Sequence, residues 1–257
     1  MSEKNQQGKR TARERLAVER ERRKAREKRR RTLVAAGTVV AVLGVAAAVG
    51  IAVAGSDGGD ASASPVVTPQ GATGDDGLAI PVGDSSAKST LTVWEDFRCP
   101  ACKQFEDTYR ATLHQLTDSG RLKIEYHLAT LIDNNSGGSG SLHAANAAAC
   151  AQQVGKFPEY HDVLYENQPP ETQDGYASNA RLLSLAGKVP GLTTAPFKKC
   201  VDGGTHDSWV RKSDKAFQDG GFQGTPTVLL NGKNVFADQK HPLTPQRLRE
   251  LVDKGKG

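Results

Sequence analysis

Two cysteines separated by two residues stand where a strand is predicted to end and a helix to begin. The motif, Cys99-Pro100-Ala101-Cys102, directly follows the largely apolar run 91–97 and precedes a helical pattern. The N-terminus of a helix presents unpaired N–H groups and the positive end of the helix dipole, and both stabilise a thiolate. Arg98 would add a positive charge beside it. The motif therefore predicts that Cys99 is a nucleophilic thiol with a lowered pKa.

The helix after the motif assigns different roles to the two sulfurs. Cys102 begins a stripe of core-type residues at spacings of three and four: Phe105, Tyr109, Leu113 and Leu116. Glu106 and its polar neighbours fall on the other face, which predicts exposure to solvent. We therefore expect Cys102 to point into the core as the resolving thiol. Cys99, one turn earlier and within disulfide reach, is expected to be open to solvent as the attacking thiol.

A zinc half-site is the alternative interpretation of the motif. It needs two further ligands at suitable spacing, and the remaining cysteines, Cys150 and Cys200, stand singly and 50 residues apart. The six histidines are scattered and support no hydrolytic site; we expect them at the surface or in the core: His114, His127, His143, His161, His206 and His241. We therefore expect that the protein binds no metal ion.

A second motif lies about 120 residues downstream. Gly224-Thr225-Pro226-Thr227 opens an apolar run that Asn231-Gly232 connects to residues 233–236. Asn-Gly is a strong signal for a two-residue hairpin turn, and proline is tolerated at the start of a strand. The residues alone favour a trans bond before Pro226, since cis bonds are about 5–6% of X–Pro bonds in folded proteins.

The two motifs together resemble the DsbA-like thiol–disulfide oxidoreductases of the thioredoxin superfamily, of the membrane-anchored actinobacterial type. The matching residues are Glu95 to Cys102 and Gly224 to Thr227. The resemblance implies an α/β thioredoxin fold over residues 77–254, with a helical insertion at about 141–219. It also implies a cis bond before Pro226, next to the active-site cysteines. Substrates would pair their backbone with Thr225, and Pro100 and Ala101 would form the active-site loop.

The same resemblance implies an activity. The protein would donate disulfides to reduced exported proteins without a cofactor, and a DsbB-like or vitamin K epoxide reductase-like membrane protein would reoxidise it. A reductase or isomerase is the alternative within enzymes, since Thr225 does not decide the direction. A membrane-tethered binding module without redox turnover is the alternative outside them, and the intact Cys99/Cys102 pair argues against it.

The resolving thiol of many relatives is served by a buried carboxylate six residues before the first cysteine. Val93 occupies that position here. Glu95 or Asp96 could replace the missing acid as a proton relay, or either could be a solvated acid at the strand end. Strand alternation places these two acids on opposite faces, so the sequence leaves the choice open.

Cys150 and Cys200 fall inside the predicted helical insertion. In an oxidising compartment two leftover cysteines more often pair than stay free, and many actinobacterial DsbA-like proteins carry such a second, structural disulfide. Closing a loop of about 50 residues would stabilise the fold by roughly 4 kcal/mol in the chain-entropy model. Two buried free thiols are the alternative.

The remaining elements follow from periodicity and capping residues. Residues 122–128 alternate as a half-buried strand, and 134–140 predict a flexible loop. Ser141 is the expected cap of a helix over 142–154. Further helices are expected at 157–166, 178–188, 194–201 and 207–218, and from Thr244-Pro245 through 251.

The first 76 residues concern the cellular location and membrane topology of the protein. Residues 1–31 carry 14 Lys or Arg against 5 Glu, and 32–54 contain no charge. As a helix the uncharged run spans about 35 Å against a hydrocarbon core of about 30 Å. It is expected to cross the membrane and contact lipid as a single-pass helix, with the basic segment in the cytoplasm and the C-terminal domain extracytoplasmic. Residues 55–76 predict a flexible linker.

Two alternatives concern this region. Ala52-Val53-Ala54 could be a signal-peptide cleavage site, although the apolar run is longer than the usual 7–15 residues. The basic segment could bind nucleic acid through Arg29-Arg30-Arg31, but topology explains its charge more simply and we expect no nucleic-acid partner. Without the net +9 of the first 31 residues, the rest of the chain is mildly acidic at −4.

Overall fold

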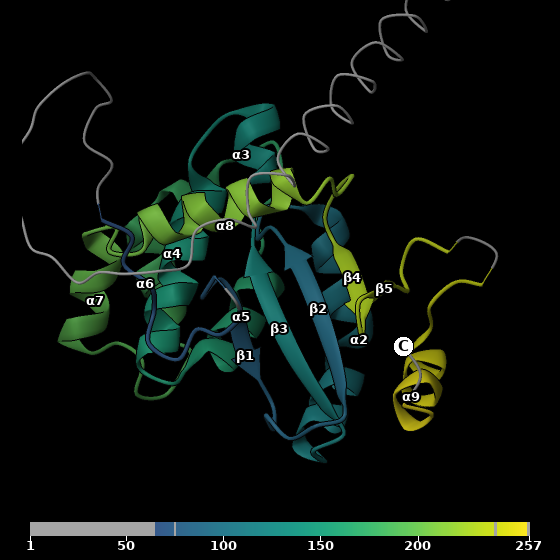
Figure 1. Ribbon diagram of the computed structural model, residues 1–257. Coiled ribbons are helices and arrows are strands. Elements are labelled where there is room, and N and C mark those ends of the chain that lie inside the picture. Colours follow the sequence, from purple (N-terminus) through teal and green to yellow (C-terminus); the bar gives the residue numbers. More distant parts are fainter. Residues whose placement is uncertain (1–64, 75, 239–240, 256–257) are drawn as a thin grey trace, which may run out of the picture. The chain divides into compact units, whose positions relative to one another are not determined.

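A five-stranded sheet organises the residues that the computed structural model describes, which are 65–74, 76–238 and 241–255. The strand order is β1-β3-β2-β4-β5 (Figure 1). The central strand β2 is parallel to β3, from Ser89 beside Leu122 to Glu95 beside Leu128, and antiparallel to β4. The strands are β1 (Ile80–Val82), β2 (Ser89–Glu95), β3 (Leu122–Leu128), β4 (Thr227–Leu230) and β5 (Lys233–Asn234).

Helices pack on both faces of the sheet because successive side chains of β2 point in opposite directions. Trp94 faces α8 (Asp207–Asp219), and its ring lies 5.8 Å from that of Phe217. Val93 faces the other way, into the core that contains Cys102 and Phe105 of α2 (Pro100–Asp118). The C-terminal helix α9 (Pro245–Asp253) packs against α2. Alternation therefore places Glu95 on the α2 side of the sheet.

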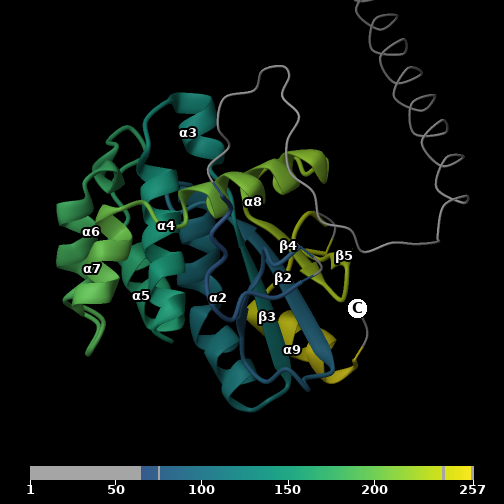
Figure 2. The same ribbon diagram turned by 60° about the vertical axis from the view of Figure 1, so that its left-hand side comes forward.

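A block of helices separates β3 from β4 in the chain and gathers beside the sheet (Figure 2). Its members are α3 (Leu131–Ser136), α4 (Gly140–Gln153), α5 (Phe157–Glu166), a 3-10 turn at Gly175–Ala177, α6 (Asn179–Ala186), α7 (Ala195–Asp202) and α8. The strand over 122–128 and the helix over 157–166 match the sequence prediction residue for residue. The predicted flexible loop at 134–140 is wrong in its first half, where α3 continues to Ser136.

The start of α4 differs from the prediction. Ser141 lies inside the helix rather than at its cap, because two carboxylates from elsewhere accept the first N–H groups. Asp174 accepts from Ser139 and Gly140 at 2.9 and 3.0 Å, and Asp133 accepts from Ser141 and the next residue at 3.0 Å. Acids at a helix N-terminus also suit its dipole. A tertiary contact thus replaces the local serine cap.

The predicted hairpin is confirmed. Asn231 and Gly232 connect β4 to β5 with φ of 47° and 83°, the positive values that a type I′ turn requires. The second strand is shorter than the expected 233–236. Phe236 leaves it and packs its ring edge-on against Phe105 of α2, with centroids 5.4 Å apart.

The N-terminal part of the described chain is attached to the helical block. The carbonyl of Val67 lies 2.7 Å from Nδ1 of His206, and Gln152 donates to the carbonyl of Gln70 at 3.3 Å. The end of the predicted linker 55–76 is therefore held by hydrogen bonds. No helix within the described residues is both long and apolar enough to cross a membrane. The predicted segments 1–31 and 32–54 lie outside the described residues.

Candidate active site

Cys99 is the residue immediately before α2, and Pro100 occupies the first helical position. Its sulfur lies 3.3 Å from the carbonyl oxygen of Thr225, to which the protonated thiol donates a hydrogen bond, so the second motif closes over the first. For this reason the expectation of an open thiol is wrong: Cys99 is 6% exposed. Both thiols of the Cys99/Cys102 pair are free in this structure, which is therefore the reduced form.

The two thiols have pKa values displaced in opposite directions. A hydrogen bond from the Cys102 thiol is the main cause that lowers the pKa of Cys99 to about 6, and the Thr225 side chain and the N–H groups of Ala101 and Cys102 add to it against the effect of burial. Burial raises the pKa of Cys102 well above the usual thiol range, and the nearby Cys99 and Glu95 charges raise it further. The first sulfur is a thiolate at neutral pH and the second is a thiol.

Arg98 does not supply the positive charge that its position suggested. Its guanidinium is buried, 2.5 Å from a carboxylate oxygen of Asp133 and 3.2 Å from one of Asp174. These are the two acids that hold the start of α4. Arg98 therefore links the active-site turn to the helical block. The N-terminus of α2 and the second thiol stabilise Cys99 instead.

The structure distinguishes between the two candidate acids. Asp96 uses both oxygens on backbone N–H groups, those of Arg98 at 2.7 Å and Ile132 at 2.8 Å, and burial raises its pKa to about 7. Glu95 acts electrostatically on the Cys102 thiol. One Glu95 oxygen contacts His161, and the other is buried without a hydrogen-bond partner in the described residues. Glu95 is the acid with an oxygen available for Cys102.

Two residues of this site escaped the sequence analysis. His161 is fully enclosed on α5, with Nε2 2.8 Å from Oε1 of Glu95. Glu106 is 1% exposed although the pattern of α2 placed it on the solvent face, because α5 covers that side of α2. A signal for His161 existed, since it continues the buried face of α5, which also contains Phe157, Tyr160, Leu164 and Tyr165.

A groove of about 500 Å³ lies beside the first turn of α2. Ala101 forms one wall, residues 221–227 form another, and Phe236 completes it. The Thr225–Pro226 peptide bond on this wall is cis. The active-site loop and the proline loop therefore border one cavity, next to the Cys99 sulfur.

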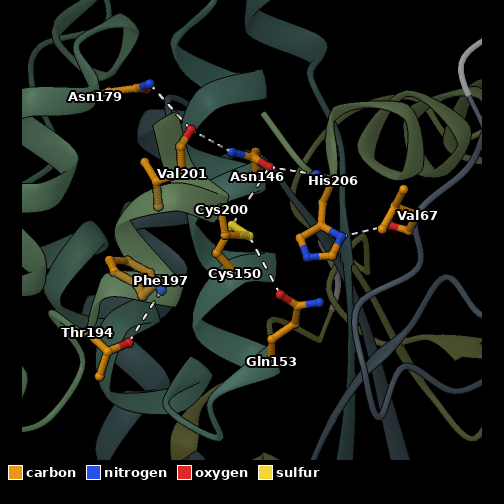
Figure 3. Close-up of a disulfide and its surroundings, with 10 residues drawn as sticks. All are labelled: Val67, Asn146, Cys150, Gln153, Asn179, Thr194, Phe197, Cys200, Val201 and His206. Carbon is orange, nitrogen blue, oxygen red and sulfur yellow. Dashed lines mark hydrogen bonds between the residues drawn. A yellow bond between two sulfur atoms is a disulfide. The ribbon is translucent and has the colours of Figure 1, made fainter. Parts of the chain in front are cut away.

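Cys150 of α4 and Cys200 of α7 form a disulfide with an S–S distance of 2.01 Å (Figure 3). Asn146 accepts the backbone N–H of His206 at 2.8 Å and donates to the carbonyl of Val201 at 3.4 Å, which connects the helices on both sides. The disulfide therefore lies within a hydrogen-bonded connection between α4, α7 and the start of α8.

Two clusters within the described part of the chain have ligand atoms close enough to hold a metal ion. In one, with His206, the Cys150 and Cys200 sulfurs are already joined to each other. In the other, Glu95, Glu106 and His161 place their ligand atoms within 4.8 Å of one another. The 2.8 Å contact between Glu95 and His161 is a hydrogen bond, which suits proton sharing.

Comparisons with known proteins agree with this geometry. A family model described as thioredoxin matches residues 76–254. The disulfide bond formation protein D of Bacillus subtilis is 29% identical over 178 residues, covering 67% of this chain and 75% of that protein. The reduced disulfide bond oxidoreductase DsbG of Mycobacterium tuberculosis superposes with a TM-score of 0.60 at 27% identity, covering 69% of this chain and 87% of that one.

The reduced DsbA of Mycobacterium tuberculosis gives a TM-score of 0.59 at 26% identity and covers 69% of this chain and 91% of that one. The residues that the family model matches include β2, the cysteine motif and α2, where the two unequal thiols lie. The chain therefore belongs to the thioredoxin family and is a DsbA-like thiol–disulfide oxidoreductase.

Proposed function

We propose that the protein is an oxidase, a donor of disulfides to reduced exported proteins. The observation that carries this proposal is the lowered pKa of Cys99, to about 6. A stabilised thiolate favours the reduced dithiol, and a pair whose reduced form is stabilised is a strong oxidant when it is a disulfide. The stabilisation of the Cys99 thiolate thus favours transfer of the disulfide from the enzyme to its substrate.

The reaction proceeds by two exchanges. A substrate thiolate attacks the Cys99 sulfur of the oxidised pair, forming a mixed disulfide while Cys102 departs and takes up a proton. A second substrate thiolate then attacks the substrate's own sulfur of this mixed disulfide, and Cys99 leaves as a thiolate. The substrate gains one disulfide and the enzyme is left with the reduced pair. The low pKa of Cys99 makes it a good leaving group in the second step.

The groove is the proposed substrate site. It borders Ala101, Thr225 and Pro226, and Thr225 contacts the Cys99 sulfur from the same wall. An extended segment that pairs its backbone beside Thr225 would place its cysteine next to Cys99. Backbone pairing is largely indifferent to side chains, so we expect a broad range of substrates. The exposed ring of Phe236 offers an apolar contact in the same groove.

The N-terminal sequence supports an extracytoplasmic site for this reaction. The uncharged run 32–54 is long enough to cross a bilayer, and the basic residues 1–31 favour a cytoplasmic N-terminus. The Cys150–Cys200 disulfide also suits an oxidising compartment. A DsbB-like or vitamin K epoxide reductase-like membrane protein would reoxidise the Cys99/Cys102 pair beside the membrane.

Equilibration with glutathione tests the direction. We expect the Cys99/Cys102 pair to have a reduction potential near the oxidising end of the family, about −120 mV. A value near about −270 mV, typical of thioredoxin, would contradict the oxidase proposal and favour a reductase. The Cys150→Ala, Cys200→Ala double variant is the control, because its signal comes from the active-site pair alone.

A further inference from the structure

A series of ionisable side chains near Cys102 has no role in the exchange steps at Cys99 described above. Glu95 Oε1 lies 2.8 Å from Nε2 of His161, and the Nδ1 atom on the other side of that ring lies 3.7 Å from Oδ1 of Asp162. Oδ2 of Asp162 in turn lies 3.1 Å from Nε2 of His114. The side chain of His114 is 50% exposed, whereas those of Glu95 and His161 are almost completely enclosed. Polar groups thus lie in a row from Glu95, whose charge acts on the buried Cys102 thiol, to the surface.

We propose that this row, Glu95–His161–Asp162–His114, is the path by which the proton of the resolving thiol Cys102 leaves and re-enters the protein. His161 and Asp162 are positioning and relay residues, and His114 is the outlet. The inference rests on thiol–disulfide exchange at Cys99 and Cys102, which oxidation and reduction both use, and it is independent of the direction proposed above.

Each oxidation of the Cys99/Cys102 pair by this path releases one proton to solvent, and every proton is accounted for. Glu95 Oε2 accepts the Cys102 proton, the Cys102 thiolate attacks the Cys99 sulfur of a mixed disulfide, and the partner sulfur leaves with its electron pair. His161 gives its Nδ1 proton towards Asp162, and His114 releases one proton to solvent. The Glu95–His161 pair changes from ion pair to neutral pair, so the buried site keeps zero net charge. Reduction runs the same steps backwards.

The ionisation states in the reduced structure suit this starting point. Burial opposes an imidazolium at His161, but the Glu95 charge and neighbouring acids outweigh it and raise the pKa of His161 to about 10. Burial raises the pKa of Glu106 to about 8, so this second acid is neutral at pH 7. Glu95 lies 2.8 Å from His161, and its charge is the largest contribution that raises the pKa of that imidazole. A buried charge needs such a partner to be stable.

Groups from every neighbouring element face His161. Glu95 comes from β2, Glu106 from α2 and Tyr126 from β3, where its ring lies 4.6 Å from the imidazole. Their remaining neighbours are the Tyr165 ring at 5.0 Å, Phe97, Phe157 and Asp162. Arg110 lies 3.2 Å from Asp162. Burial would raise the pKa of that carboxylate, but the hydrogen bond from His114 and the charges of both histidines outweigh it and lower the pKa. The 3.7 Å gap between His161 and Asp162 exceeds a hydrogen bond, so proton passage there needs a small turn of the ring.

The lifetime of a glutathione adduct on Cys99 measures the step that needs this path. Reduced full-length protein is mixed with oxidised glutathione between pH 5 and 9, quenched with acid and analysed by mass spectrometry. Adduct formation reports Cys99, and adduct decay reports deprotonation and attack by Cys102. For His161→Gln we expect normal formation and a decay roughly ten- to a hundredfold slower near pH 7. Its decay should accelerate with every pH unit, because solvent base must then take the proton.

His114→Gln and His241→Gln form a matched pair. Both histidines are exposed and lie near one aspartate, at 3.1 Å from Asp162 and 3.0 Å from Asp238. We expect His114→Gln to slow adduct decay in the same direction as His161→Gln but by a smaller factor, and His241→Gln to change nothing. Since His114 is at the surface, this pair also tests the path if His161→Gln does not fold.

Nitrogen NMR of His161 supplies a readout that a purely structural role would not move. We expect an imidazolium in the reduced protein and a neutral ring in the oxidised protein at pH 7. An unchanged charge state would overturn the path. The path would also be overturned if both His161→Gln and His114→Gln kept the wild-type rate and pH dependence of adduct decay. An equal slowing of adduct formation and adduct decay would overturn it too. If the wild-type protein forms no adduct, the exchange activity itself fails, which is a separate result.

Discussion

The two cysteine pairs are buried to the same degree and have opposite chemical settings. Cys99 and Cys200 are each 6% exposed, and Cys102 and Cys150 are almost completely enclosed. Cys99 precedes the first turn of α2, where N–H groups and a second thiol point at its sulfur. Cys150 lies well inside α4 and Cys200 near the end of α7, so neither is at the N-terminus of its own helix. Exposure therefore does not separate the reactive pair from the structural one.

What separates them is the position of sulfur in the helix. At an N-terminus the backbone groups are unpaired and can stabilise a thiolate, whereas inside a helix they are already bonded to carbonyls. The spacing matters too, because three residues place both sulfurs of the first pair on one helix turn, and 50 residues separate those of the second. One pair is built to open and close, and the other to hold α4 against α7.

Removing single active-site thiols should have the largest effect. We expect Cys99→Ser to abolish mixed disulfides with a reduced unfolded protein, since no activated sulfur remains. Cys102→Ser should trap them, since the resolving thiol is lost. Non-reducing gels with mass spectrometry measure both outcomes. Trapping by Cys99→Ser, or preferential iodoacetamide labelling of Cys102 in the reduced protein, would reverse the assignment of attacking and resolving thiols.

The structural pair should matter mainly for stability. Cys150→Ala with Cys200→Ala is expected to lower the free energy of unfolding by up to about 4 kcal/mol, because the unfolded chain loses the constraint of a closed loop of about 50 residues. Urea unfolding of the full chain measures it. The matched control is Cys99→Ala with Cys102→Ala, which removes a disulfide that closes a loop of only a few residues. Its free energy of unfolding should fall by less, about 2 kcal/mol at most. A larger loss in the control would contradict the division of roles.

Sequence reasoning predicted what depends on local pattern. The strand 122–128, the helix 157–166 and the hairpin at Asn231-Gly232 all follow from neighbours along the chain. It failed where a distant element decides. Asp133 and Asp174, rather than Ser141, accept the first N–H groups of α4. Arg98 forms ion pairs with those same two acids instead of lying beside the Cys99 sulfur.

Glu106 and His161 show the same limit inside the candidate site. Glu106 was assigned to solvent by helix periodicity, but α5 packs on that side of α2 and buries it. His161 meets Glu95 across 66 residues of chain, a contact that no spacing rule contains. The alternation of β2 could not choose between Glu95 and Asp96 until the structure showed which face α2 covers, and the bonds of Asp96 to the backbone then completed the choice.

The pH dependence of Cys99 should sharpen the contrast further. With a pKa of about 6 against an ordinary 9.0, roughly 90% of Cys99 is thiolate at pH 7 and an ordinary thiol is about 1% thiolate. Iodoacetamide should therefore label Cys99 with a midpoint near pH 6. The lowered pKa stabilises the reduced fold fully above pH 9.0, and this stabilisation is lost as pH falls through about 6. A labelling midpoint near 9 would remove the basis for the oxidase proposal.

The smallest expected effect is the influence of one pair on the other. Both pairs border the same core, yet the groups that lower the pKa of Cys99 are Cys102, Thr225 and Ala101, none of which belongs to α4 or α7. Independent sites usually add within about 0.5 kcal/mol, which is roughly a factor of two in rate. The Cys150→Ala, Cys200→Ala variant should thus keep the wild-type labelling midpoint and its rate within about twofold, at temperatures where it is folded. A displaced midpoint in folded protein would mean that the structural disulfide also positions the N-terminus of α2. Arg98 would then be the residue to examine, since it joins the active-site turn to the start of α4 through Asp133 and Asp174.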